Sequence, residues 1–163
     1  MSPARDERPT GRAAAPRGLA VSVVVPVYNG GTLVEGCLRA LDTQTLEANR
    51  YEVVVVDDGS TDDTVARVRA FAGRCAIVLV EQVTNKGPAA ARNAGIAAAT
   101  ADVIAFTDVD CEPAPDWLER ALDALAAHGE APAVEGRTEP KGEPTALTHQ
   151  MINRTGGLWM TCN

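Results

Sequence analysis

Two aspartates separated by a single valine follow an apolar run in the stretch ADVIAFTDVDCEP, residues 101–113. Asp108 and Asp110 are two positions apart, and on an extended chain side chains at that spacing point to the same side. Such a pair could hold a divalent cation, could act as nucleophile and acid of a phosphatase, or could end a strand in a solvated turn. The other polar residues of the sequence distinguish between these chemistries.

A divalent cation at this pair would suit a particular kind of ligand. Mg²⁺ usually takes only one or two protein carboxylates and completes its shell with water and substrate phosphates. One carboxylate could therefore hold Mg²⁺ or Mn²⁺ while the other accepts a hydrogen bond from a ligand hydroxyl. The pair thus favours a site for a nucleotide diphosphate.

Polar side chains also follow three other apolar runs of the sequence. They are, in chain order, Tyr28, Asp57, Asp58 and Arg92. In open α/β sheets, ligands bind at the carboxyl ends of the strands. The convergence of four separate loops on that edge is stronger evidence for a site than any single motif.

The charged members of this set each have a predicted role and a simpler alternative. Asp57 could accept a hydrogen bond from a base N–H, such as N3–H of uracil, whereas Asp58 suits capping of the next helix. Arg92 leans back toward the N-terminus of its helix and could reach an anion near Lys86 and Gly87, where free backbone N–H groups are expected. The alternative for this arginine is a solvated position on an exposed helix face.

Apolar runs alternate with helical patterns along the chain, which is typical of an α/β fold. Strands are expected at 19–27, 51–60, 75–83, 103–106 and 131–137, the last of them weaker. One helix is expected to begin near Thr32, which fits a capping box with Glu35, and another at Pro88. Because the strands are apolar throughout, we expect a mostly parallel sheet covered by helices on both faces.

Length and charge limit the classes of protein to which this sequence can belong. The 163 residues suit one domain, and 45% apolar residues can form a core. The net charge of -7 argues against a general affinity for nucleic acid, which relies on clustered Lys and Arg. No run approaches the roughly 18 apolar residues of a membrane span, so we expect none in this segment.

Targeting signals and cysteine usage indicate a compartment. Residues 1–18, MSPARDERPTGRAAAPRG, mix Arg with Pro and Gly and are predicted to form a disordered tail. Cys37, Cys75, Cys111 and Cys162 are scattered and form no C-x-x-C pair, which is typical of reduced thiols. We therefore expect a cytoplasmic protein, and a longer parent could still be held at the cytoplasmic face of a membrane.

The sequence contains four characteristic segments, in the order VSVVVPVYNGG, YEVVVVDDGSTDDT, NKGPAAARNAG and ADVIAFTDVDCEPAPDWLERAL. In order and spacing they resemble the family 2 glycosyltransferases, which have the GT-A fold. The resemblance spans roughly residues 21–125, and the closing WMTCN is similar to the start of a later family segment. Residues 19–163 are therefore expected to form the N-terminal, nucleotide-sugar-binding domain of such an enzyme, truncated before its acceptor and base region.

The resemblance implies an inverting transferase that takes a sugar from a nucleotide-diphosphate donor, most often a UDP-sugar, with Mg²⁺ or Mn²⁺ as cofactor. In this family the metal neutralises the leaving diphosphate, and a carboxylate deprotonates the acceptor hydroxyl. The family's base lies downstream of the position equivalent to Asn163, so no catalytic residue is assigned here. The acceptor, which could be a glycan, a lipid, a protein or a small molecule, stays open.

The family motifs also imply site residues by their position. These are Pro26, Val27 and Tyr28 along the base, Asp57 on uracil, Arg92 at the nucleotide, Asp108 at the ribose and sugar, and Asp110 on the metal.

Three other functions compete with sugar transfer. A D-x-D phosphatase would use Asp108 as nucleophile and Asp110 as acid, but it leaves Asp57, Arg92 and the PVYN segment unexplained. A nucleotide-sugar-binding module without catalysis explains the same residues and stays open for this segment. A dinucleotide-binding Rossmann domain is disfavoured because no G-x-G-x-x-G follows the first strand.

Overall fold

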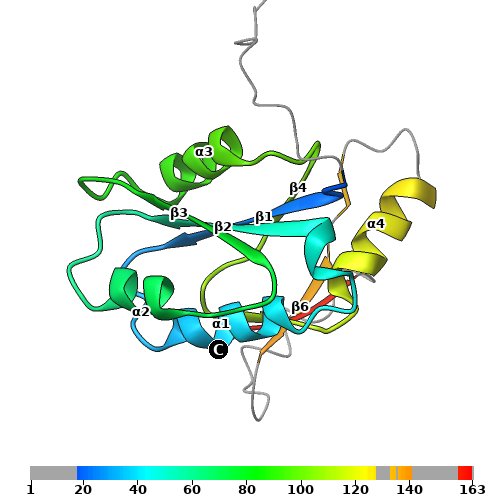
Figure 1. Ribbon diagram of the computed structural model, residues 1–163, viewed down its shortest axis with the longest axis horizontal. Helices are drawn as coiled ribbons and strands as arrows, with labels where there is room; N and C mark the ends of the chain where they lie inside the picture. Colours follow the sequence, from blue (N-terminus) through cyan, green and yellow to red (C-terminus); the bar gives the residue numbers. More distant parts are fainter. Residues whose placement is uncertain (1–17, 128–132, 135, 141–157, 163) are drawn as a thin grey trace, which may run out of the picture.

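The computed structural model describes residues 18–127, 133–134, 136–140 and 158–162. A parallel sheet forms its centre, with the strand order β3-β2-β1-β4 (Figure 1). Its strands are β1 (Val21–Val27), β2 (Tyr51–Asp57), β3 (Ala76–Glu81) and β4 (Val103–Phe106). The predicted α/β fold with a mostly parallel sheet is thus confirmed. The predicted N-terminal tail lies outside the described residues except for Gly18.

Helices cover both faces of this sheet, as the apolar strands require. The helices are α1 (Leu33–Asp42), the short 3-10 helix η1 (Ala48–Arg50), α2 (Thr64–Ala70), α3 (Pro88–Ala98) and α4 (Trp117–Ala127). Helix α3 lies on one face, and α1, α2 and α4 lie on the other (Figure 1). Val23 and Val25 of β1 pack toward α1, whereas Val24 packs toward α3. Both sides of the strand are buried, which explains its unbroken apolar run.

Helix α3 lies unusually close to the sheet because one of its residues lacks a side chain. Gly95 is buried, and a Cβ there would fall well inside van der Waals distance of a Val24 methyl group and 3.1 Å from Val56 Cγ2. Ala91 and Gly95, the buried residues of α3, therefore serve helix–sheet packing. The same helix begins at Pro88, as predicted.

A second, smaller sheet was only partly expected. It has the order β5-β7-β6 and contains β5 (Cys111–Pro113), β6 (Gly136–Pro140) and β7 (Leu158–Cys162). Strand β5 is antiparallel to β7, and β6 is parallel to it. The strand expected at 131–137 overlaps β6, which begins only at Gly136. Ala133 and Val134 lie outside any strand, and Pro132 before them lacks the N–H that strand pairing requires.

Two local expectations are wrong. Thr32 makes no side-chain cap hydrogen bond, and Glu35 instead forms ion pairs with Arg39 at 2.6 Å and with Arg67 at 2.5 Å. Ion pairing with two guanidinium groups takes the carboxylate away from the capping box. Cys111 is disulfide-bonded, whereas Cys37 and Cys75 are free. Cysteine usage therefore no longer supports a cytoplasmic location.

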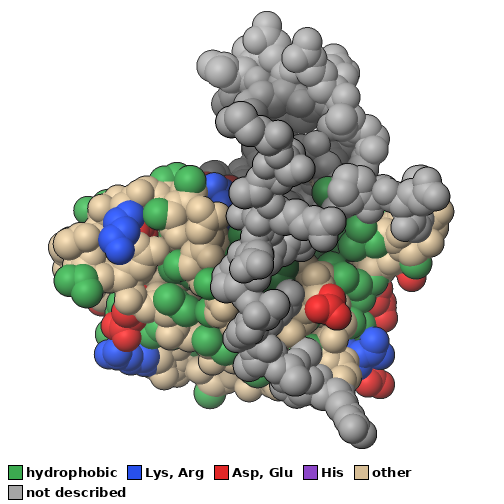
Figure 2. All heavy atoms as spheres, turned by 90° about the horizontal axis from the view of Figure 1, so that it is seen from above, with side chains coloured by type: hydrophobic (Ala, Val, Ile, Leu, Met, Phe, Trp, Pro, Cys, Tyr) green, Lys and Arg blue, Asp and Glu red, His purple; other side chains and the backbone are tan. Residues whose placement is uncertain are grey.

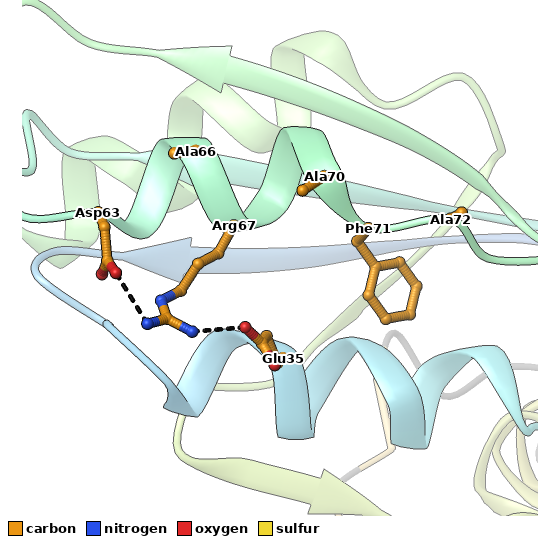
Figure 3. Close-up of a pocket in the computed structure, with 7 residues that line it drawn as sticks. All are labelled: Glu35, Asp63, Ala66, Arg67, Ala70, Phe71 and Ala72. Atoms are coloured by element: carbon orange, nitrogen blue, oxygen red, sulfur yellow. Dashed lines mark hydrogen bonds and ion pairs between the residues drawn. The ribbon is translucent and has the colours of Figure 1, made fainter.

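A cavity of about 450 Å³ lies between α1 and α2 (Figure 3). Arg67 reaches from α2 between Asp63, at 2.8 Å, and Glu35 of α1, at 2.5 Å. Phe71 and small alanines form the remaining wall. The ion pairs link the two helices, so we interpret this cavity as a feature of helix packing.

A buried carboxylate fastens the amino ends of the central strands. Glu52 is 4% exposed, and its Oε1 accepts hydrogen bonds from Ser22 Oγ at 2.6 Å and from both the N–H and the hydroxyl of Thr100 at 2.7 Å. The N–H of Ala101 donates to Ser22 Oγ at 2.9 Å. Burial alone would raise the pKa of Glu52, but these hydrogen bonds outweigh it and the pKa is lowered.

Replacing this carboxylate should change how stability depends on pH. Because the folded-state pKa of Glu52 is lowered, its contribution is present above the unfolded-state pKa and is lost as pH falls through the folded value. We expect Glu52→Gln to cost about 1–3 kcal/mol of unfolding free energy at neutral pH and to reduce the loss of stability on acidification. Urea denaturation between pH 7 and acid checks this, with exposed Glu47→Gln as control. Parallel curves for wild type and Glu52→Gln would contradict it.

The packing of α3 predicts opposite effects for two glycine substitutions. We expect Gly95→Ala to destabilise the fold by about 1–3 kcal/mol, because the added methyl group overpacks against Val24. Gly36→Ala in α1 places its methyl group 3.2 Å from the end of the flexible Glu112 side chain and gains helix propensity. Thermal unfolding of the two variants compares them directly. Equal melting temperatures would mean that α3 does not depend on Gly95.

Candidate functional site

A cavity of about 430 Å³ opens at the carboxyl ends of the strands. Its walls come from the loops after β1, β2, β3 and β4, which the sequence predicts to converge. Five of the seven predicted site residues line it, namely Pro26, Val27, Tyr28, Asp108 and Asp110. Asn29, Asp58 and Asn85 contribute further polar groups. Four loops distant in sequence therefore form one concave site.

The sixth predicted residue reaches this wall through an ion pair. Arg92 lies in the second turn of α3, and its Nη2 is 2.6 Å from Oδ1 of Asp108. The side chains are 38% and 57% exposed, so both are accessible to a ligand. The ion pair places the guanidinium of Arg92 near the carboxyl edge of the sheet, as expected, although the side chain is also open to solvent.

The seventh predicted residue, Asp57, does not line the cavity. It is 3% exposed, and its Oδ2 accepts the N–H of Ser60 at 3.1 Å, which shapes the turn after β2. Its neighbour Asp58 lines the wall instead. The two side chains diverge as adjacent residues must, but the sequence alone does not show which of them faces the cavity.

Asp58 also fastens the loop that leads into α3. Its Oδ1 accepts the N–H of Lys86 at 2.9 Å, and its Oδ2 accepts the N–H of Gly87 at 2.8 Å. The expectation that these two backbone groups are free to bind an anion is therefore wrong. A carboxylate at the end of β2 already satisfies them, and it thereby positions the first turn of the helix that carries Arg92.

Hydrogen bonds also join the loop after β1 to the loop after β2. Asn29 has a positive φ of 50°, which asparagine tolerates better than most residues. Its Oδ1 accepts the N–H of Thr61 at 2.8 Å, and its own N–H donates to Ser60 Oγ at 2.8 Å. Gly31 N–H donates to Asp62 Oδ2 at 3.0 Å. These bonds hold Tyr28, which is 50% exposed, at the mouth of the cavity.

The two D-x-D aspartates lie in a turn after β4, and not on extended chain as expected. The N–H of Cys111 donates to the carbonyl of Asp108 at 3.0 Å, which closes a β-turn over residues 108–111. Asp108 and Asp110 nevertheless both face the cavity. Turn geometry, and not the alternation of a strand, brings the carboxylates together.

The donor set suits a hard divalent cation. Two of the carboxylates that line the cavity belong to the D-x-D turn, which matches the one or two that Mg²⁺ takes from a protein. Within the described residues, no group of three or more His, Cys, Asp and Glu side chains forms a closed cage. A cation held here would therefore complete its shell with oxygens of water and ligand.

Basic side chains are scattered on the face of the molecule where α3 lies (Figure 2). Figure 2 views the side on which α3 lies, and there the Lys and Arg side chains stand at separate places, with no continuous basic surface among the described residues. Within the described residues, no helix is both long and apolar enough to cross a membrane.

Comparison with curated proteins gives relatives that are named as glycosyltransferases. Glycosyltransferase AglE of Haloferax volcanii is 40% identical over 111 residues, which cover 67% of this chain and 36% of that protein. The validoxylamine A glucosyltransferase of Streptomyces hygroscopicus subsp. jinggangensis is 40% identical over 114 residues, or 69% of this chain and 26% of that protein. The chain thus spans about a third or less of the length of these relatives.

Solved structures agree with the sequence comparison. TarS 1-349 of S. aureus in complex with UDP superposes with a TM-score of 0.66 at 27% identity, over 78% of this chain and 39% of that one. The mannosyltransferase PcManGT of Pyrobaculum calidifontis, in complex with GDP-Man and Mn2+, gives a TM-score of 0.64 at 33% identity, over 84% and 40%. The central sheet and its helices therefore have the GT-A fold.

The model of the family named glycosyl transferase family 2 matches residues 22–160, which include all four loops of the cavity. This range covers most of the chain, and the relatives and the fold agree with it. The chain belongs to glycosyl transferase family 2.

Proposed function

We propose that this chain binds the nucleotide-diphosphate sugar, most simply a UDP-sugar, of an inverting, metal-assisted glycosyltransferase. The observation that carries the proposal is the convergence of Pro26, Val27, Tyr28, Asp108 and Asp110 on one cavity. Its volume of about 430 Å³ lies within the usual range for small-molecule sites. TarS with UDP and PcManGT with GDP-Man support the donor class.

The base of the nucleotide is proposed to lie between the β1 and β3 loops. Pro26, Val27 and the exposed ring of Tyr28 offer it an apolar surface. Asp58 lines the wall and can accept from a base N–H with the lone pairs that Lys86 and Gly87 leave unused. The base contact predicted for Asp57 remains part of this proposal, because its buried Oδ1 has no hydrogen-bond partner among the described residues, and Asp58 is the second candidate acceptor.

The diphosphate is proposed to lie between Arg92 and the D-x-D turn. Asp110, with Asp108 beside it, would hold the Mg²⁺ or Mn²⁺, which when bound supplies positive charge to the departing diphosphate. Arg92 would add its guanidinium to the same oxygens. The base that activates the acceptor is proposed to lie outside the described residues, and the acceptor class stays open between glycan, lipid, protein and small molecule.

Binding of UDP should depend on the metal through Asp110. We expect calorimetric titration of this chain to show tighter UDP binding with Mn²⁺ than without it, because a cation held by Asp110 would add positive charge for the diphosphate. Asp110→Ala should remove most of that difference, whereas Asp123→Ala, at an exposed position of α4, should keep it. Equal UDP affinity with and without Mn²⁺ in the wild type would contradict the proposed metal site.

The aromatic ring at the cavity mouth should contribute independently of the metal. We expect Tyr28→Ala to weaken UDP binding by about tenfold, since stacking of a base on an aromatic ring contributes about 1–3 kcal/mol. The loss should be the same with and without Mn²⁺, and Tyr28→Phe should bind as the wild type does. A loss in Tyr28→Phe as large as that in Tyr28→Ala would assign the effect to the hydroxyl group.

A further inference from the structure

We propose that Arg92 is a positioning residue that occupies Asp108 until the donor arrives and so makes tight metal binding depend on the nucleotide. The proposal rests on the proposed function and deepens it. In the nucleotide-free site, Arg92 would keep Asp108 out of the coordination of the metal. The diphosphate would then draw the guanidinium away and leave Asp108 to the ribose, the sugar or the metal.

The two carboxylates of the D-x-D turn are electrostatically unequal. Asp108 accepts from Arg92 at 2.6 Å, and opposite charges at that distance compensate each other. Asp110 lines the same cavity and, within residues 18–127, forms no ion pair with Lys or Arg. At the D-x-D turn, a cation that enters without nucleotide therefore meets the uncompensated carboxylate of Asp110 and a nearby positive charge on Arg92.

The pair joins two elements whose backbones are fixed. The turn at residues 108–111 is closed by its own hydrogen bond. Helix α3 is seated on the sheet at Gly95, and its first turn is tied to Asp58 through Gly87. Only side-chain rotation is then needed to move the guanidinium from carboxylate to phosphate.

The competition between the two anions favours the diphosphate. Arg92 and Asp108 are 38% and 57% exposed, and exposed ion pairs are weak because water screens them. A diphosphate carries more negative charge and more acceptor oxygens, and arginine binds phosphate through two parallel N–H donors. The ion pair therefore holds Asp108 in the empty site and yields when a diphosphate competes for Arg92.

A double-mutant cycle tests this exchange without any turnover. Mn²⁺ binding to the 163-residue chain, without nucleotide, is measured from the electron paramagnetic resonance signal of free Mn²⁺. We expect Arg92→Gln to bind Mn²⁺ about fivefold more tightly or better, since it frees Asp108 and removes a positive charge. Arg120→Gln removes the same charge from an exposed pair on α4 and should bind as the wild type does.

The Asp108→Asn mutation distinguishes release of the Asp108 carboxylate from the mere loss of a positive charge. In an Asp108→Asn background, Arg92→Gln should lose most of its gain in Mn²⁺ affinity, because no carboxylate is released. An equal gain in both backgrounds, or no gain in either, would overturn the proposal. Circular dichroism melts establish that all four proteins are folded.

Titration of UDP distinguishes this inference from the proposed function. With saturating Mn²⁺, Arg92→Gln should bind UDP more weakly than the wild type, although it binds the metal alone more tightly. Opposite changes for the two ligands support the exchange. If the wild type binds UDP with Mn²⁺ but Arg92→Gln does not gain affinity for the metal alone, only the role of Arg92 fails. If the wild type binds no UDP, the proposed function fails as well.

Discussion

The carboxylate of Asp58 holds the binding edge of the molecule together. It lies at the end of a buried strand and accepts the N–H groups of Lys86 and Gly87, so the loop after β3 has a fixed path into α3. Its own N–H donates to the carbonyl of Val27 at 2.8 Å, which ties the loop after β1 to the same point. Without this carboxylate, the loop after β3 would lose its connection to the end of β2, whereas the loops after β1 and β2 would stay joined through the Asp58 N–H and through Asn29.

Electrostatics supports the proposed role of a cation in the site. The chain carries a net charge of -7, and the proposed ligand is also an anion. Asp58, Asp108 and Asp110 face the cavity, whereas Arg92 supplies the basic group in ion-pair contact with it. Close approach of a diphosphate to such a wall is unfavourable until positive charge is added. A divalent ion and a movable guanidinium are two ways of adding it.

Much of this arrangement is readable from the sequence because it follows from strand burial. Val23, Val24 and Val25 indicate a strand covered on both faces, and parallel strands place their following loops at one edge. The choice between Asp57 and Asp58 is not readable, because the direction of a side chain past the last paired residue depends on the local turn. Hydrogen bonds orient the two side chains: Ser60 N–H, in the same turn, donates to Asp57, and Lys86 N–H, in the next loop, donates to Asp58. Strands β5 and β7 were missed for a similar reason, since they are short and depend on pairing with distant segments.

The close packing of α3 on β1 at Gly95 and Val24 influences the binding site, although neither residue lines the cavity. The absence of a side chain at Gly95 and the size of Val24 set the height of α3 above the sheet, and Arg92 is one turn away on the same helix. A larger residue at either position would lift the guanidinium from the carboxyl edge. Related sequences are therefore expected to change these two positions together, keeping their summed volume while each varies.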